Sequence, residues 1–409
     1  MKIQDVDMFY FALPEIRDIG DGSQDLLLVR VRTESHIGWG ECEASPLASI
    51  AGLVAPVSHS ACHPVIDSVV GQEINSPEDI LRIGRVVRAR SLDLLQASHT
   101  WSGIEIALWD LLGKAREVPV YELLGFSNPK PKTAYASLLF GATPQETLNR
   151  AKQCAAAGFR AVKFGWGLYG AGTVSDDVDQ VMAAREGLGP DANLMVDAGT
   201  IWVDDVDAAL ARIPSLEQAG VFWLEEPFTG GAVRSYAQLA ARSPKVGLAG
   251  GEGSHMQNVA ETLIDHGGIK FVQIDCGRIG GIGPSAAVAR YADAQGVQYV
   301  NHTFTSHLAL SASLHAFAGI DSGWLCEYPV EASELAMGIT SDHIEVGQDG
   351  CVRTPDKPGL GLSLDLEACK RYLVDVEISV AGKVLFRSGV PSESPAGARA
   401  SHPATEMEG

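Results

Sequence analysis

The stretch Leu194-Met195-Val196-Asp197-Ala198-Gly199 decides how the chain folds, because its pattern recurs along the sequence. A short apolar run, typical of a buried strand, ends in an acidic residue. An apolar run of this kind returns at intervals of about 25 residues, each time ending in an acid or a histidine. The residues that close the successive runs are Asp197, Glu225, Glu252, Asp275, His302 and Glu327.

An interval of about 25 residues accommodates one strand, one helix and two short loops, the repeating unit of a parallel barrel of about 250 residues. Helical patterns between the apolar runs, such as Pro144 to Ala157 and Ser285 to Gln295, support this interpretation. In such barrels the chemistry lies where the strands end. The strands are predicted at 133–140, 160–164, 193–197, 221–225, 247–251, 270–275, 297–302 and 323–327.

The chain on either side of the barrel follows different patterns. Residues 1–130 read as a small α+β domain, with strands at 3–13, 25–33 and 37–43 and helices from Pro77 and over about 101–116. The barrel is predicted over 131–359, and a hairpin within 360–388 is predicted to pack back on the N-terminal sheet. The last residues, 389–409, are rich in Ser, Pro, Ala and Gly and predict disorder.

The composition excludes several classes of partner. The 51 acidic and 31 basic residues give a formal charge of −20, which repels nucleic acid and anionic membranes, so an anionic substrate needs a local cation. No apolar run is long enough to span a bilayer. Asp5 and Asp7 interrupt any signal peptide, and the seven scattered cysteines predict reduced thiols, so we expect a cytoplasmic protein.

Three of the strand-end acids predict a metal site. Asp197, Glu225 and Glu252 follow consecutive strands, and three carboxylates in one barrel mouth repel each other unless a cation lies among them. Oxygen ligands without cysteine or histidine favour Mg²⁺. The alternative is that each acid is a solvated loop residue or pairs with an arginine of the barrel. Glu226 is a weaker candidate, because neighbours on a strand point in opposite directions.

Asp275 and His302 end adjacent strands, so a hydrogen bond between them is geometrically natural. Such a pair fixes the imidazole tautomer and raises its pKa, which suits proton transfer. Lys163 is predicted at the end of the second strand, where its ammonium faces His302 across a bound substrate. The alternatives are a structural histidine and a lysine that only neutralises the ring of carboxylates.

Other residues are candidates for substrate contact. Glu327 ends the eighth strand and can donate a hydrogen bond to a substrate carboxylate if it is protonated; otherwise it is an ordinary rim acid. Trp166 is a candidate for the pocket wall, with packing as the alternative. The loops at 14–24 and 45–65 are expected to cover the pocket, and His59 and Arg17 are candidates to reach it. A divalent ion with acid/base groups suits removal of the proton next to a carboxylate.

The chain resembles the enolase superfamily, and within it the mandelate racemase subgroup of the mandelate racemase/muconate lactonizing enzyme family. The resemblance covers nearly the whole chain, and the set of motifs is specific although each motif alone is weak. The motifs are Gly38-Trp-Gly-Glu41, Ser102 to Lys114, Pro119 to Gly125, Val196-Asp197, Leu224-Glu225-Glu226-Pro227, Gly251-Glu252, Gln273-Ile-Asp275, Asn301-His302 and Pro358-Gly-Leu-Gly361.

The resemblance implies a modified TIM barrel, (β/α)₇β, with an α+β capping domain built from both chain ends. It implies one Mg²⁺ on Asp197, Glu225 and Glu252, with His302, paired with Asp275, as acid or base. It also implies that loops of the capping domain choose a small carboxylate substrate, and that the protein assembles as a homo-oligomer.

One departure from the family pattern bears on the reaction. Members of this subgroup often have Lys-x-Lys at the end of the second strand, whereas Lys163 is followed here by Phe164 and Gly165. A missing second lysine disfavours racemisation, which needs two matched bases. Dehydration of a sugar acid to a 2-keto-3-deoxy acid stays available. A racemase or epimerase, and a catalytically silent binding protein, are the alternatives.

Overall fold

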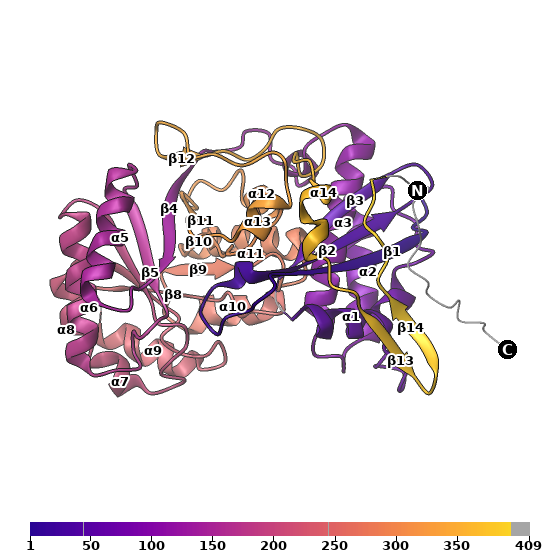
Figure 1. Ribbon diagram of the computed structural model, residues 1–409. Helices are drawn as coiled ribbons and strands as arrows, with labels where there is room; N and C mark the ends of the chain where they lie inside the picture. Colours follow the sequence, from indigo (N-terminus) through magenta and orange to yellow (C-terminus); the bar gives the residue numbers. More distant parts are fainter. Residues whose placement is uncertain (44, 244, 394–409) are drawn as a thin grey trace.

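The computed structural model describes residues 1–43, 45–243 and 245–393. Figure 1 shows a barrel surrounded by helices on one side of the molecule and a smaller capping domain on the other. From residue 394 onward the predicted disordered tail lies outside the described residues, so that prediction is not tested.

The capping domain is built on a three-stranded antiparallel sheet. Its strands, in spatial order, are β1 (Asp5–Ala12), β2 (Asp25–Arg32) and β3 (Ile37–Cys42), as predicted. Helix α3 (Ala97–Arg116) packs very closely against β3. The closeness is seen at Gly38, where an added Cβ atom would lie 1.9 Å from the backbone oxygen of Ala107. The helix begins at Ala97, earlier than the residue 101 predicted, and the residue before it, Gln96, already has backbone angles in the right-handed helical region.

Further helices complete the capping domain. Helix α2 (Pro77–Arg90) begins where the sequence predicts, with Pro77 in the first turn and a capping box between Ser76 and Asp79. Shorter elements lie around it: α1 (Pro46–Val54), η2 (Val65–Ser68) and α4 (Val120–Leu123).

The C-terminal segment lies against the capping domain, at the lower right of Figure 1. Strands β13 (Glu377–Val380) and β14 (Lys383–Arg387) form the predicted hairpin, and Phe386 is fully buried in the core of the capping domain. Leu373 forms a β-bridge with Phe11 of β1. The boundaries at residues 130 and 359 stay a prediction.

All eight predicted barrel strands are present, and they lie parallel to one another. Their spatial order is β10-β9-β8-β7-β6-β5-β4-β11, and a short strand, β12 (Cys351–Val352), pairs with the start of β4. The strands are β4 (Lys132–Leu139), β5 (Ala161–Gly165), β6 (Asn193–Asp197), β7 (Val221–Glu225), β8 (Gly247–Gly250), β9 (Phe271–Ile274), β10 (Gln298–Asn301) and β11 (Leu325–Pro329).

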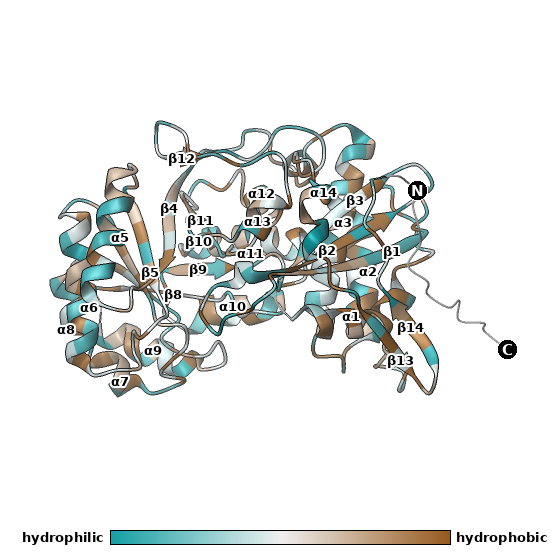
Figure 2. Cartoon of the chain, in the orientation of Figure 1, coloured by the Kyte–Doolittle hydropathy of each residue, from teal (hydrophilic) through white to brown (hydrophobic). Residues whose placement is uncertain are grey.

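Helices connect successive strands and cover the outside of the barrel. Figure 2 shows hydrophilic and hydrophobic turns side by side on these helices, as expected for helices with one face on a sheet. They are α5 (Pro144–Ala156), α6 (Val174–Leu188), α7 (Val206–Leu210), α8 (Ile213–Gln218), α9 (Val233–Arg242), α10 (Gln257–His266), α11 (Ile282–Gln295) and α12 (His307–Ala316). After β11 follow α13 (Glu334–Gly338) and α14 (Leu366–Cys369).

A side chain joins the first and last strands of this order. The amide oxygen of Asn301 on β10 accepts a hydrogen bond from the backbone N–H of Glu327 on β11 at 2.9 Å. Its amide nitrogen donates to the backbone oxygen of Glu327 at 3.3 Å. Asn301 therefore takes the place of backbone pairing at the point where the barrel closes.

The barrel interior has an apolar floor to which each strand contributes one buried residue. These residues are Tyr135, Ala161, Met195, Trp223, Ala249, Phe271, Val300 and Leu325. Because side chains alternate along a strand, the residue two positions further on also points inward, one layer nearer the C-terminal mouth. The next layer is polar, and it contains the predicted site.

Candidate active site

The polar layer above the floor brings together residues that lie far apart in the sequence. Seven of its members stand two positions after a floor residue of the same strand or its immediate continuation: Ser137, Lys163, Asp197, Glu225, Gln273, His302 and Glu327. Period-two alternation along parallel strands thus explains why these side chains share the barrel interior.

A cavity of about 230 Å³ opens above this layer, between the barrel and the capping domain. Of the predicted site residues, Lys163, Trp166, Asp197, Glu252 and His302 line it. Glu225, Asp275 and Glu327 lie behind this wall, and each of them contacts a residue that lines the cavity. The capping domain contributes Ile19, Gly20, Asp21, Gly22 and Glu43.

His302 and Asp275 form the predicted pair. The imidazole Nδ1 of His302 lies 2.7 Å from Oδ2 of Asp275, and its Nε2 lies 3.2 Å from Oε2 of Glu252. Burial alone would lower the pKa of His302, but the carboxylates of Glu252 and Glu327 and the bond to Asp275 outweigh it and raise the pKa to about 10. In this arrangement both imidazole nitrogens carry a proton, so the side chain is positively charged and can act as an acid.

Lys163 contacts three buried carboxylates. Its Nζ lies 2.5 Å from Oε1 of Glu225, 2.8 Å from Oε1 of Glu327 and 3.6 Å from Oδ2 of Asp197. Burial opposes the charged ammonium, yet these carboxylates raise the pKa of Lys163 well above its usual value. The lysine therefore neutralises the ring of acids here, which is one of the two roles that its sequence position suggests.

Glu327 is fully buried rather than at the rim. Ser137 Oγ donates to its Oε1 at 2.8 Å and the backbone N–H of Thr303 donates to its Oε2 at 2.8 Å. Burial would raise the pKa of Glu327, but Lys163 and His302 lower it overall, so the group is an ionised acceptor. Glu327 is therefore not in the protonated state that it would need to donate a hydrogen bond to a substrate.

The three expected metal ligands fall into two groups. Asp197 and Glu225 are register partners on β6 and β7 and share Lys163, whereas Glu252 contacts Arg278 and His302. Among the described residues, no three His, Cys, Asp or Glu side chains are arranged to hold a metal ion. The Lys163 ammonium stands between the first two carboxylates, so a metal ion there requires the lysine to turn away.

The chemistry of the donor set nevertheless fits a divalent cation. Burial raises the pKa of Asp197 to about 6 and the pKa of Glu225 to about 8, although Lys163 acts in the opposite direction. The single charge of Lys163 therefore does not offset the burial of these two carboxyl groups, and a divalent cation would favour their ionised form. Glu226 is buried with φ of 38° and its pKa is raised well above the usual value by burial and the neighbouring acids, so it stays neutral.

Sequence reasoning missed a salt bridge between the two domains. Arg278, in the turn after β9, donates from Nη2 to Oε1 of Glu43 at 2.7 Å and from Nε to the other oxygen. Its Nη1 donates to Oε1 of Glu252 at 3.0 Å. Glu43 directly follows β3 of the capping domain, so the pair links that domain to the barrel mouth. The signal that the sequence offers for this salt bridge is Arg278 itself, an arginine three residues after Asp275 to which the strand pattern gives no role.

Trp166 lies between two loops at the mouth. A Cβ atom on Gly20 would lie 2.6 Å from Cγ of Trp166, and one on Gly199 would lie 2.9 Å from its Cε2. The side chain is 45% exposed and has a left-handed backbone with φ of 57°. Figure 1 shows the loop between β1 and β2, which carries Gly20, extending from the capping domain towards the barrel.

Two further candidates do not line the cavity. His59 lies 3.1 Å from Asp93 on the surface of the capping domain, and its side chain is half-exposed. Arg17 bonds through its backbone to the side chain of Gln24 within the loop. Neither side chain therefore belongs to the site in this structure.

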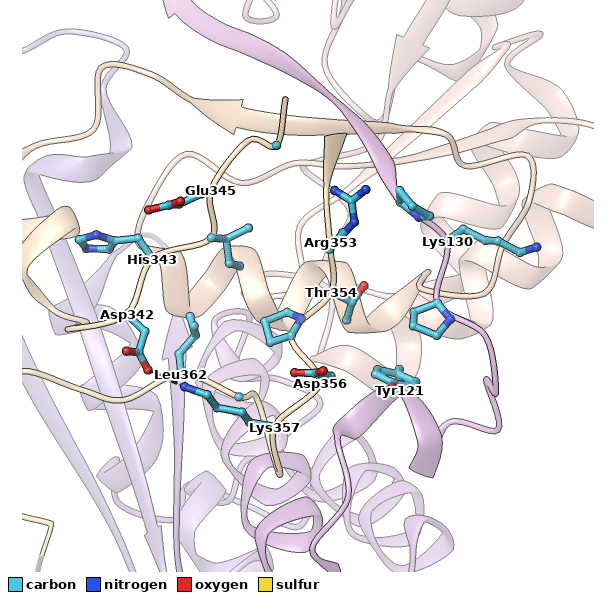
Figure 3. Close-up of a pocket in the computed structure, with 16 residues that line it drawn as sticks. Tyr121, Lys130, Asp342, His343, Glu345, Arg353, Thr354, Asp356, Lys357 and Leu362 are labelled. Carbon is cyan, nitrogen blue, oxygen red and sulfur yellow. Dashed lines mark hydrogen bonds and ion pairs between the residues drawn. The ribbon is translucent and has the colours of Figure 1, made fainter. Parts of the chain in front are cut away.

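A larger cavity, of about 730 Å³, lies elsewhere, beside the start of β4 (Figure 3). Charged side chains of both signs face it, among them Asp342, Lys357 and Arg353. Lys357 pairs with Asp342 at 3.4 Å and Arg353 with Asp349 at 2.5 Å. The residues that line this cavity include none of the predicted site residues, which gather at the barrel mouth instead.

Comparison with known proteins agrees with this geometry. Residues 19–125 match the mandelate racemase/muconate lactonizing enzyme N-terminal domain, and residues 146–368 match the family described as enolase C-terminal domain-like. The chain belongs to the mandelate racemase/muconate lactonizing enzyme family of the enolase superfamily. The predicted family and its modified TIM barrel are thereby confirmed.

Members of this family with known structures are close in fold. A predicted mandelate racemase from Rhodobacter sphaeroides is 56% identical, with a TM-score of 0.90 over 96% of this chain and 100% of that chain. A racemase from Streptomyces coelicolor A3(2) with bound magnesium is 26% identical, with a TM-score of 0.76 over 91% of this chain and 100% of that one.

Among curated members of the family, names include both dehydratases and isomerases. A D-galactonate dehydratase of Xanthomonas oryzae pv. oryzae is 30% identical over 84% of this chain and 90% of its own length. A 3,6-anhydro-alpha-L-galactonate cycloisomerase of Streptomyces coelicolor is 30% identical over 68% of this chain and 73% of its own length. These relatives are named for reactions of sugar acids, and the comparison supports an enzyme. In the described part of the chain, no helix is both long and apolar enough to cross a membrane.

Proposed function

We propose that this protein is a Mg²⁺-dependent acid-sugar dehydratase that converts a sugar acid into a 2-keto-3-deoxy acid. The observation that carries the proposal is the bond of 2.7 Å between His302 and Asp275, beside Lys163 and the buried carboxylates of one cavity. The proposal is supported by the fact that an imidazole and an ammonium line the same cavity.

Asp197, Glu225 and Glu252 would hold the metal ion. Bound there, a divalent cation supplies positive charge next to the substrate carboxylate and so makes the neighbouring C–H proton more acidic. The carboxylate donors and the raised pKa values of Asp197 and Glu225 support this assignment.

Lys163 and His302 then carry out the proton transfers of the reaction. A base removes the proton from C2, and the electron pair forms the C2–C3 double bond as the C3–O bond breaks. Lys163 or His302 acts as this base after it has released its own proton, a release that the positive charge of a bound divalent cation would favour. His302, charged and oriented by Asp275, gives its Nε2 proton to the departing hydroxyl, which leaves as water. The enol takes a proton at C3 and becomes the 2-keto-3-deoxy acid. Glu327 holds Lys163 in place, and Trp166 closes one side of the cavity.

A racemase, epimerase or cycloisomerase is the second candidate. Lys163 and His302 both line the cavity, so two acid/base groups are available to one substrate, and a relative 30% identical carries a cycloisomerase name. Against racemisation, the second lysine of the Lys-x-Lys pattern is replaced by Gly165. The third candidate is a binding protein without catalytic activity.

One experiment separates these functions. The Mg²⁺-loaded protein is incubated with a library of sugar acids in D₂O, and products are followed by proton NMR and by a semicarbazide assay for 2-keto acids. We expect a 2-keto-3-deoxy acid from at least one substrate. An inverted stereocentre or a rearranged ring without loss of water would establish the isomerase, and no exchange of any α-proton would favour the binding protein.

A further inference from the structure

The capping-domain side of the cavity carries acids and an arginine that is paired with carboxylates. Glu43 and Asp21 line it, and the lining residues include a lysine and an arginine, Lys163 and Arg278. Each of the three guanidinium nitrogens of Arg278 donates to a carboxylate oxygen, two of them to Glu43 and one to Glu252. Its single positive charge is therefore shared between two carboxylates.

Close packing fixes this arrangement. A Cβ atom on Gly277, next to Arg278, would lie 2.7 Å from both N and Cβ of Glu43, so the end of β3 rests directly on the turn that carries the arginine. The Glu43 side chain is only 7% exposed and that of Arg278 only 19%. If Arg278 turned to a ligand, the nearly buried carboxylate of Glu43 would lose this guanidinium, which is unfavourable, although Glu252 would keep its contact with His302.

We propose that the substrate is a monocarboxylic sugar acid rather than a dicarboxylic one, and that Glu43 is the residue that enforces this specificity. This inference rests on the proposed function, since it takes the single carboxylate to lie at the Lys163 side. At the opposite side Glu43 and Asp21 accept hydrogen bonds from the hydroxyl groups of an aldonate. A second carboxylate meets these acids without a free cation and is repelled.

The wild-type protein tests the inference directly. The value of kcat/KM is measured with Mg²⁺ for aldonates of five and six carbons and for the aldarates of the same configuration. We expect each aldarate to react at least about 100-fold less efficiently than its aldonate, because like charges meet in a desolvated site. An aldarate that reacts as well as its aldonate overturns the inference while the dehydratase function stands.

Binding gives an answer that does not depend on turnover. Isothermal titration of the Mg²⁺-loaded protein with the same acids is expected to show tighter binding of the aldonates. If no acid reacts but aldonates bind more tightly, the proposed reaction is wrong and the specificity is supported. Tighter binding of the aldarates contradicts the specificity whatever the reaction.

A variant isolates the role of Glu43. Glu43→Gln keeps an acceptor oxygen, removes the negative charge and leaves Arg278 with charge to offer a second carboxylate. We expect the preference for aldonates to fall at least about 10-fold, since a repulsive element is removed. The matched control is Glu377→Gln, which removes an acid paired with Arg387 in the exposed β13–β14 hairpin, and it should leave the preference unchanged.

Arg17 supplies the decisive counter-test, because it is a cation on the loop that covers the cavity. If an aldarate reacts with the wild-type protein and Arg17→Gln abolishes that reaction, the loop arginine binds the second carboxylate and the inference is wrong. Circular dichroism of each variant establishes folding. If Glu43→Gln does not fold, the comparison of aldonates with aldarates on the wild-type protein still tests the proposed specificity.

Discussion

A Cβ atom on Gly165 would lie 2.8 Å from Cβ of Asp197 and 3.0 Å from its Oδ2. The two residues are register partners at the ends of β5 and β6. A side chain at position 165 therefore competes with Asp197 for the same space. The close contact gives a physical reason why β5 carries Lys163 without a second lysine at position 165.

Restoring the family pattern at this position should damage the site. Gly165→Lys and Gly165→Ala both place a Cβ against Asp197 and displace its carboxylate, so we expect Mg²⁺ affinity, measured by isothermal titration, to fall at least about 10-fold. Gly230→Ala is the matched control, because nothing lies within 4 Å of its added Cβ. A Gly165→Lys variant that binds Mg²⁺ normally and racemises an acid would contradict this account.

His302→Asn should abolish dehydration while leaving the folded protein and its Mg²⁺ binding in place. The amide cannot deliver a proton to the departing hydroxyl, so we expect kcat to fall at least about 100-fold. Asp275→Asn should lower kcat as well, since Asp275 holds Nδ1 of the imidazole. Activity near the wild-type level in His302→Asn would show that another group is the acid.

Lys163→Met removes the cation shared by Asp197, Glu225 and Glu327. We expect loss of turnover by at least about 100-fold, whichever role the lysine has. Exchange of the α-proton in D₂O separates the roles. If exchange persists in Lys163→Met and disappears in His302→Asn, then His302 is the base and Lys163 acts through its charge; the reverse result assigns the base to Lys163.

The barrel and its polar layer could be predicted from the sequence because both depend on local periodicity. Alternation along a strand fixes which residues point inward, and repetition every 25 residues or so fixes which strand each belongs to. This is why the sequence alone predicts Lys163, Asp197 and His302 as members of one site.

The salt bridge between Arg278 and Glu43 has no such signal. It depends on how the end of β3 docks against the turn after β9, and no periodicity links residues 43 and 278. The contact of Lys163 with three carboxylates was one of the two roles that the sequence suggested, but the sequence does not show which acids the ammonium contacts. Periodicity along the sequence therefore does not predict which side chains pair across the interface between the two domains.

The loop that carries Gly20 should control access to the cavity through Trp166. Gly20→Ala places a Cβ within 2.6 to 2.8 Å of the indole and pushes the loop away from it. We expect KM to rise several-fold with little change in kcat, because the chemistry lies deeper in the barrel. Trp166→Ala should raise KM in the same direction. An unchanged KM in both variants would show that this contact does not influence substrate binding.

The stability of the metal-free protein should fall as the pH rises from 5.5 to 8.5. The pKa of Asp197 is raised from 3.8 to about 6 and that of Glu225 from 4.5 to about 8, with burial as the main cause. A carboxyl group with a raised pKa binds more protons in the folded protein than in the unfolded chain. The free energy of unfolding then decreases as the pH rises from the unfolded value to the folded one.

His302 acts in the same direction, because its raised pKa of about 10 makes its contribution fully present below pH 6.5 and lost towards pH 10. Glu252, with its pKa lowered to about 2, loses its contribution only at more acidic pH, outside this range.

Mg²⁺ should reverse the trend, because it binds the ionised carboxylates and stabilises the folded protein by mass action. We therefore expect the increase in Tm on adding Mg²⁺, followed by differential scanning calorimetry with EDTA as the reference, to be larger at pH 8.5 than at pH 5.5. Asp197→Asn should lose most of this increase at both pH values. An increase that is equal at the two pH values, or that survives in Asp197→Asn, would place the ion away from the carboxylates of the barrel mouth.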